Sequence, residues 1–225
     1  MPDIVLALDT ATSATVVGLS GPGILEPIER RDEPEGGGRS RHAEALLPLA
    51  RDALRAADLD FRDVERVVVG TGPGLRSGLE VGIAAGRAMA LAAGAEIVGV
   101  STLRALAEPA EAAVGPQSVV APVLVARRDR VHMAAWRAGH VVLTPRRVSP
   151  DRAAELAREG GAWKRRVWLA VGDGAMLFRS ALEAAGVSVP ADRSVLHRVD
   201  ARVLCRIGAE ADAVDRAAVV PAVEA

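Results

Sequence analysis

The chain has 225 residues, half of them hydrophobic and a quarter charged, and its formal net charge is −1. Near-neutral charge argues against a protein that holds nucleic acid through a strong basic field of its own. The single cysteine, Cys205, rules out an internal disulfide framework, so we expect a reducing, cytoplasmic location. The apolar run from Ile4 to Leu8 is too short for a signal peptide and lacks its basic flank, and no segment has the roughly 20 apolar residues of a membrane helix.

The first half of the chain alternates between short β-rich segments and longer segments of helical periodicity. Strands are predicted at residues 3–9, 14–20, 23–31, 66–70 and 96–100. Helices are predicted at 41–57, 75–93 and 101–113, with Ser40 as the N-cap of the first. The three initial strands indicate an antiparallel meander, and the later alternation of strands and helices indicates a parallel sheet portion.

The second half continues the same kind of alternation. Strands are predicted at 118–126, 130–137, 140–148 and 166–171, and helices at 150–159, 175–186 and 200–215. The whole pattern predicts an α/β protein of two lobes, with residues 1–104 in the first lobe and 105–225 in the second.

Residues 70–94, GTGPGLRSGLEVGIAAGRAMALAAG, are rich in glycine and raise the question of a phosphate-binding loop. A Walker loop ends in Gly-Lys-Ser/Thr, but the only lysine of this chain is the distant Lys164. The dinucleotide pattern Gly-x-Gly-x-x-Gly fails too, because its third glycine falls on Leu75 when counted from Gly70 and on Ser77 when counted from Gly72. A phosphate resting on backbone amides at the helix N-terminus stays open as a weaker alternative.

The glycines of the predicted helix 75–93 form a ridge. Gly78, Gly82, Gly86 and Ala90 recur every four residues, so they lie on one side of the helix. Each interior glycine costs about 1 kcal/mol of helix stability relative to alanine, and close approach of another backbone offsets that loss. We therefore predict that the ridge packs against a partner chain. The alternative is that both sides of the helix are covered within this chain.

Four segments carry a resemblance to a known family. LALDTAT near the start, RHAEALLPL, VVGTGPGLRSGLEVGIAAGRAMA and VGVSTLRALA resemble the TsaB (YeaZ-like) family. The resemblance implies a two-lobed actin-like ATPase (ASKHA-type) fold with mixed sheets and a reduced second lobe. It implies a non-catalytic subunit in the synthesis of threonylcarbamoyladenosine on tRNA, paired with a TsaD-like catalytic subunit or with a second copy of itself. A TsaE-like ATPase would act indirectly, tRNA would be reached only through the complex, and no membrane, metal or cofactor of its own is implied.

The family pairs through two helices of its first lobe, which correspond here to 41–57 and 75–93. The partner interface is therefore predicted to comprise His42, Leu46, Leu49, Leu75, Arg76, Gly78, Leu79, Val81, Gly82, Ala85, Gly86 and Met89.

The glycine segment also departs from the family pattern G-P-G-[SP]-F-T-G-L-R-[IV]-G. Leu75, Arg76, Ser77 and Glu80 replace its small residue, aromatic residue, threonine and arginine. Glu80 reverses a charge on the predicted interface, which would have to be compensated or would weaken the usual pairing. A divergent paralogue acting as a homodimeric binding protein is therefore an alternative function.

A small actin-like ATPase or phosphotransferase is another alternative. Asp9, Thr10 and Thr12 stand where such enzymes carry a phosphate loop, but Ala11 replaces its glycine, so a turn-capping role for Asp9 is favoured. Asp173 in VGDGA is the only candidate for a second loop. His42 alone is no metal site, and no His-Glu-x-x-His motif occurs. WKRRVW (163–168) could stack on RNA, although a basic turn entering a strand is favoured.

Overall fold

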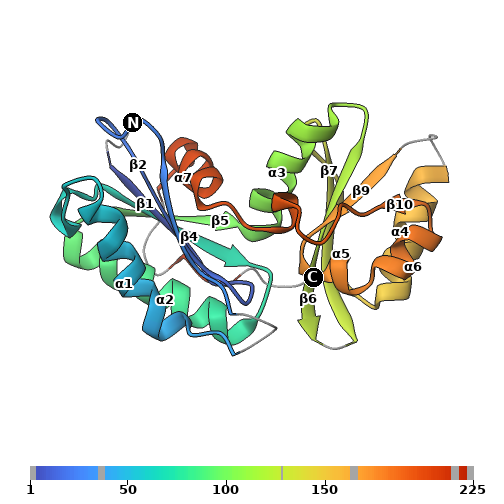
Figure 1. The fold of residues 1–225 in the computed structure, drawn as a ribbon, viewed down its shortest axis with the longest axis horizontal. Coiled ribbons are helices and arrows are strands. Elements are labelled where there is room, and N and C mark those ends of the chain that lie inside the picture. The colour runs from blue at the N-terminus through green and yellow to red at the C-terminus, as the bar shows by residue number, and fades with distance from the viewer. Residues whose placement is uncertain (1–3, 35–38, 128, 163–166, 214–217, 222–225) are drawn as a thin grey trace. The chain divides into compact units, whose positions relative to one another are not determined.

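The computed structural model describes residues 4–34, 39–127, 129–162, 167–213 and 218–221. These residues form two compact units (Figure 1). The first unit runs to Thr102 and takes up the chain again from Asp200, and the second unit is Leu103–Val199.

Five strands form the sheet of the first unit, in the order β3-β2-β1-β4-β5. Their bounds are β1 Val5–Asp9, β2 Thr15–Ser20, β3 Ile28–Asp32, β4 Arg66–Gly72 and β5 Glu96–Ser101. The first three pair antiparallel, and β4 pairs parallel with both β1 and β5, as predicted. β3 begins later than the predicted residue 23, because a turn closed by the Ile24 N–H on the Gly21 carbonyl precedes it.

Helices α1 (His42–Arg55) and α2 (Arg76–Ala93) cover one face of this sheet (Figure 1). Their buried side chains, among them Leu46 and Ile83, share a core with Leu6 and Leu8 of β1. The predicted Ser40 cap of α1 is wrong: Arg41 holds the N-cap position without a side-chain cap, and its carbonyl accepts hydrogen bonds from the N–H groups of residues 44 and 45.

Helix α7 (Ala201–Glu210) covers the opposite face, although it follows the whole second unit in sequence (Figure 1). It packs very closely there: a Cβ on Gly208 would lie 2.2 Å from Cγ2 of Val68 in β4, and one on Gly18 of β2 would lie 2.7 Å from the Ala201 carbonyl oxygen. Glycine is therefore required at both places for helix and sheet to touch.

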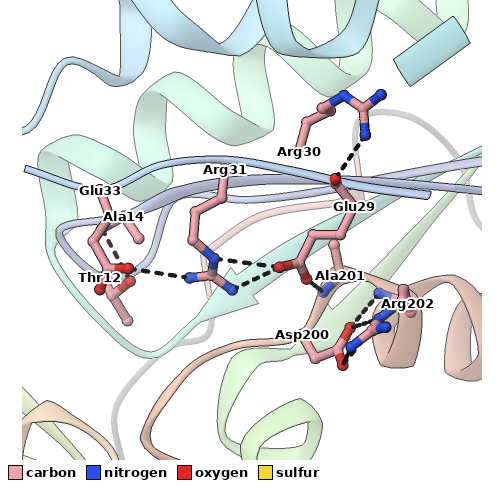
Figure 2. Close-up of polar contacts among 9 residues, drawn as sticks. All are labelled: Thr12, Ala14, Glu29, Arg30, Arg31, Glu33, Asp200, Ala201 and Arg202. Atoms are coloured by element: carbon pink, nitrogen blue, oxygen red, sulfur yellow. Dashed lines mark hydrogen bonds and ion pairs between the residues drawn. The ribbon is translucent and has the colours of Figure 1, made fainter. Parts of the chain in front are cut away.

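Polar contacts hold both ends of α7 on the sheet. At its start, Glu29 of β3 accepts a hydrogen bond from the Ala201 N–H at 2.9 Å, and the Asp200 carboxylate accepts one from the Arg202 N–H (Figure 2). At its end, the buried Arg66 guanidinium donates to the carbonyls of Gly208, Ala209 and Ala211 at 2.7–3.2 Å. These contacts satisfy backbone groups that a helix end leaves unpaired.

The predicted division of the chain is therefore corrected at its C-terminal side. Residues 105–225 were expected to form the second lobe, but α7 belongs to the first unit because its apolar side and both of its ends pack on the first sheet. The predicted helix 200–215 is shorter in the structure and ends at Glu210.

The second unit repeats the strand arrangement of the first. Its strands are β6 Val119–Arg127, β7 Arg130–Arg137, β8 His140–Val148, β9 Trp168–Val171 and β10 Val187–Ser188, in the order β8-β7-β6-β9-β10. As in the first sheet, three strands pair antiparallel and two are added in parallel. Sequence reasoning missed both this correspondence and β10, which has only two residues.

The second unit also has four helices, α3 (Thr102–Val114), α4 (Pro150–Ala162), α5 (Asp173–Leu177) and α6 (Arg179–Ala184), and a one-turn 3₁₀ segment at Val195–His197. The first unit has a similar 3₁₀ segment at Phe61–Asp63. The predicted helix 175–186 is two short helices, because Phe178 leaves helical geometry at φ −110° and ψ 26°. Alanines of α4 and Leu182 of α6 pack on the sheet core.

Candidate functional site

The glycine ridge of α2 packs against the sheet of its own unit. A Cβ on Gly78 would lie 2.0 Å from the Thr10 carbonyl oxygen, and one on Gly82 would lie 2.2 Å from Thr10 Oγ1. A Cβ on Gly86 would lie 2.3 Å from Cγ2 of Val69. The prediction that these glycines admit a partner chain is therefore wrong, because the close approach they permit is to Thr10, directly after β1, and to β4.

The other predicted interface residues divide by exposure. Those whose side chains belong to the unit's own interior are His42, Leu46, Leu79 and Met89. Leu49, Leu75, Val81 and Ala85 are half-buried, and Arg76 is exposed. The part of the predicted set that a partner could touch is thus its half-buried and exposed members.

The outward face of α2 carries a stripe that sequence reasoning missed. We define the outer stripe as Ser77, Val81, Ala84, Ala88 and Leu91. Its members follow one another at steps of four and three residues, the spacing of a helix-to-helix seam. Val81 is half-buried and the others are exposed, Leu91 by 69%. On α1, Leu47 is exposed by 41%. The spacing was visible in the sequence, but the glycines drew attention to the opposite side of the helix.

Two of the charged residues beside the outer stripe, Arg76 and Glu80, form an ion pair. Arg76 donates from Nε to Glu80 Oε1 at 2.9 Å, one helical turn away. Both side chains are well exposed, so the pair contributes little to stability. The charge of Glu80 therefore has a counter-charge on the same helix.

A cavity of about 610 Å³ lies at the N-terminal ends of α1 and α2. It is lined by Arg39, Ser40, Arg41, His42, Ala43, Glu44, Leu75, Ser77 and Val81. His42 forms a 2.9 Å hydrogen bond between Nδ1 and Thr15 Oγ1, and burial lowers its pKa. Its Nε2 has no hydrogen-bond partner among the described residues. Burial thus favours the neutral form of the imidazole, and the bond to Thr15 ties it to β2.

The segment predicted as a vestigial phosphate loop is engaged in internal contacts. Asp9 is fully buried and accepts from the Ala11 N–H at 2.8 Å and from the Thr102 hydroxyl at 2.7 Å. Burial raises the pKa of this carboxyl. The Thr10 hydroxyl donates to the Gly78 carbonyl, and Thr12 Oγ1 accepts from the Ala14 N–H. These contacts are those of a turn cap and of helix docking.

The second candidate phosphate loop, at Asp173, is also engaged in contacts within the chain. Asp173 accepts from the Val125 N–H at 2.9 Å, and burial raises its pKa. The flanking Gly172 has φ 104°, and a Cβ on it would lie 2.5 Å from the Val123 carbonyl oxygen. The loop thus closes on β6, and its glycines serve that contact.

The remaining sequence features are the single cysteine, the WKRRVW segment, and possible metal sites or membrane helices. Cys205 is buried, as expected of a core thiol. Residues 163–166 of WKRRVW lie outside the described residues, and Trp168 is in the core of the second unit. Across the described ranges, no three metal-binding side chains come together. None of the helices described is both long enough and apolar enough to cross a bilayer.

Comparisons with known proteins agree on one group of relatives. The model of the family described as "TsaD: tRNA N6-adenosine threonylcarbamoyltransferase" matches residues 34–168. The chain is 31% identical over 133 residues to "tRNA threonylcarbamoyladenosine biosynthesis protein TsaB" of Escherichia coli (strain K12), covering 59% of this chain and 54% of that protein. It is 34% identical over 115 residues to a "tRNA N6-adenosine threonylcarbamoyltransferase" of Caulobacter vibrioides, covering 44% and 31%. The aligned part thus spans about half, or less, of these curated relatives.

Solved structures extend the likeness to nearly the whole chain. "YeaZ from Pseudomonas aeruginosa" superposes with a TM-score of 0.79 at 25% identity, covering 98% of this chain and 99% of that one. The ethanolamine utilization protein EutJ from Carboxydothermus hydrogenoformans shares the fold alone, with a TM-score of 0.50 at 13% identity over 91% of this chain and 90% of that one. These likenesses, with the two mixed sheets, confirm the predicted α/β fold of the actin-like ATPase type.

Proposed function

Because the chain belongs to the TsaB (YeaZ-like) family, we propose that it is a non-catalytic subunit in the synthesis of threonylcarbamoyladenosine on tRNA, paired with a TsaD-like catalytic subunit. The Escherichia coli relative is named for that biosynthesis, and the family model is described as the threonylcarbamoyltransferase. In this proposal the partner handles the nucleotide and the transferred group. A TsaE-like ATPase acts through the complex, which also provides the contact with tRNA.

The proposed pairing rests mainly on one observation, the outer stripe of α2. It presents small and apolar side chains to solvent along most of an 18-residue helix, and Leu47 is exposed on α1. A seam with steps of four and three residues accepts another helix along its length, and alanines allow the two backbones to approach closely. The partner is therefore expected to present a helix, or a pair of helices, to α1 and α2.

The two candidate phosphate loops support a non-catalytic role. Asp9 and Asp173 both use their carboxylates to cap the chain's own backbone, and neither is exposed. Gly70 beside Asp9 leaves no free space, since a Cβ there would overlap Asp9 Oδ2 at 1.8 Å. A nucleotide would have to displace these contacts.

The pairing is tested by one substitution and a matched control. Ala88→Arg places a long cation in the middle of the outer stripe, whereas Ala184→Arg makes the same change at an exposed position of α6. We expect Ala88→Arg to weaken binding to the TsaD-like protein of the same organism by roughly 30-fold or more, as at an interface hot spot. Ala184→Arg is expected to leave the affinity unchanged. Calorimetry measures the affinity, and circular dichroism checks that both variants are folded.

Two results would overturn this assignment. Equal affinities for a folded Ala88→Arg variant and the unmodified chain would place the interface elsewhere. Failure of the unmodified chain to bind the TsaD-like protein, combined with a dimer that Ala88→Arg dissolves, would favour the homodimeric binding protein instead. Light scattering coupled to gel filtration separates those cases.

A further inference from the structure

A groove lies between α1 and β3, one of the two edge strands of the first sheet. Its volume is about 580 Å³. We call it the α1–β3 groove and define it by its lining residues, Arg31, Asp32, Arg41, Ala45, Pro48, Leu49, Arg51, Asp52 and Arg55. Of these residues, Leu49 alone also belongs to the predicted partner interface.

The groove has an excess of positive charge. Its two carboxylates are already paired, Asp32 with Arg41 at 2.9 Å and Asp52 with Arg30 at 2.7 Å. Arg51 and Arg55 are exposed, and neither makes an ion pair with any described residue. They stand one helical turn apart, so their like charges repel each other until an anion lies between or beside them.

The strand that borders the groove has an open side. β3 pairs with β2 alone among the described strands, and it stands at the edge of the sheet. Figure 2 shows the neighbouring side chains of Arg30 and Arg31 on opposite faces of β3. Arg31 is held by Glu29 at 3.1 Å on the α7 face, so the guanidiniums available in the groove come from α1. An edge strand offers unpaired N–H and C=O groups to an added strand, and of the carbonyls of β3 that of Glu29 already accepts from Arg30 Nη1 at 3.1 Å.

We propose that the α1–β3 groove binds an acidic peptide segment of a partner protein, which adds to β3 as an extended strand and pairs its carboxylates with Arg51 and Arg55. Alternate residues of a strand point to the same side and stand about 6.6–6.8 Å apart, close to the spacing of neighbouring helical turns. The recognised segment should therefore carry Asp or Glu at every second position. Strand addition supplies the affinity from the main chain, and the arginines select the sequence.

The lining favours a peptide over a nucleic acid. Among the residues that the structure describes, no aromatic side chain lines the groove, so bases would have no ring to stack on there. Asp32 and Asp52 would repel a phosphate backbone running past them, whereas a peptide can place uncharged residues there. Ala45, Pro48 and Leu49 give the groove an apolar wall that suits side chains of an extended segment.

The test uses the isolated full chain, so its outcome is independent of pairing with a TsaD-like subunit. Fluorescence anisotropy would follow a labelled peptide of sequence Val-Glu-Thr-Glu-Val-Glu-Thr-Glu-Val, and the same peptide with Lys for every Glu. We expect the acidic peptide to bind and the basic one to fail. Arg51→Glu with Arg55→Glu should weaken binding by about tenfold or more. Arg146→Glu with Arg147→Glu, the same charge change on β8, should leave it unchanged.

Two further probes decide the mode of binding. The acidic peptide with N-methyl groups on alternate peptide bonds keeps its charges but cannot pair as a strand, and it should lose binding. Equal binding of that peptide, or no binding of the unmethylated one, overturns the proposal. Binding of a twelve-nucleotide oligouridylate that is lost in the Arg51→Glu, Arg55→Glu variant, with no binding of the acidic peptide, would make the groove a phosphate-backbone site instead.

Discussion

At the end of β1, the carboxyl of Asp9 is fully buried, and that burial raises its pKa above the usual value of 3.8. The Ala11 N–H and the Thr102 hydroxyl donate to it and offset part of the loss of hydration. The folded state therefore holds the Asp9 proton more tightly than the unfolded chain does. Its contribution to stability is complete below the unfolded pKa and is lost as the pH rises through the raised folded pKa.

Asp9→Asn keeps the shape of this side chain and removes its charge. The amide oxygen can still accept from the Ala11 N–H, and the amide nitrogen can donate to the Thr102 hydroxyl. We expect Asp9→Asn to be more stable than the unmodified chain at pH 7, by on the order of 1 kcal/mol or ~2–4 °C in Tm. The difference should shrink as the pH falls toward 4. Urea unfolding across this range measures it, and a variant less stable at every pH would contradict the argument.

At the scale of one residue, sequence reasoning identified the turn but not its partners. The position of Asp9 after a strand and before two threonines predicted a turn cap, and the Ala11 N–H confirms it. The Thr102 hydroxyl lies 93 positions away in the chain. Nothing local could indicate it, because strand register brings the two together only after β1, β4 and β5 have paired.

Helix α2 shows why a periodic pattern can reveal a contact without revealing its direction. Four-residue spacing of glycine predicted close approach on one side, and the structure has such an approach. The same spacing fits a partner chain and the helix's own sheet equally well. The deciding fact is that the side opposite the glycines carries Ala84, Ala88 and Leu91 in contact with solvent. Arg76, Glu80 and Arg87 mark a narrow stripe of that outer side, but the small residues beside them left the direction open.

Gly82→Ala distinguishes packing from helix propensity. Propensity alone predicts a gain of about 1 kcal/mol, because alanine is the better helix former. The structure predicts a loss, since the new Cβ would lie 2.2 Å from the Thr10 hydroxyl oxygen, which is itself bound to the Gly78 carbonyl. Overpacking of this kind costs about 1–3 kcal/mol. Urea midpoints should fall for Gly82→Ala. A rise in the midpoint would show that the packing against the sheet tolerates a Cβ at this position.

For the control, Ala92 lies on the same helix and is exposed. Ala92→Gly should lose about 1 kcal/mol from propensity alone, with no packing contribution. The two substitutions are opposite in chemistry, yet both are expected to lower stability. That combination is expected only if Gly82 is held against the sheet.

At the scale of the whole molecule, the chain leaves the first unit after Thr102 and returns to it at Asp200. Sequence reasoning predicted the strands and the fold class because strand and helix periodicities are local. It assigned α7 to the wrong unit, because an amphipathic pattern does not indicate which of two sheets the helix packs on. The ties that decide this, Glu29 to Ala201 and Arg66 to the end of the helix, join residues more than 140 positions apart.

The thiol of Cys205 reports on whether α7 stays in place. Cys205 is the only cysteine, it is 1% exposed, and burial raises its pKa to about 12. Reaction with a disulfide reagent at pH 8 therefore needs the helix to detach. Arg66→Ala removes the donor to three carbonyls at the end of α7, and we expect it to speed labelling about tenfold or more. Arg62→Ala, at an exposed site, serves as the control. Identical labelling rates for the two variants would contradict the proposal that Arg66 holds α7 on the sheet.

The late position of α7 has a consequence for biosynthesis. When the ribosome has added residue 101, every strand of the first sheet has been synthesised, yet about a hundred more residues must be added before the helix that covers Val5, Ala7 and Val68 exists. While the second unit is being synthesised, the face of the first sheet that α7 later covers stays exposed. That nascent surface, absent from the finished protein, is where we expect a chaperone to bind first.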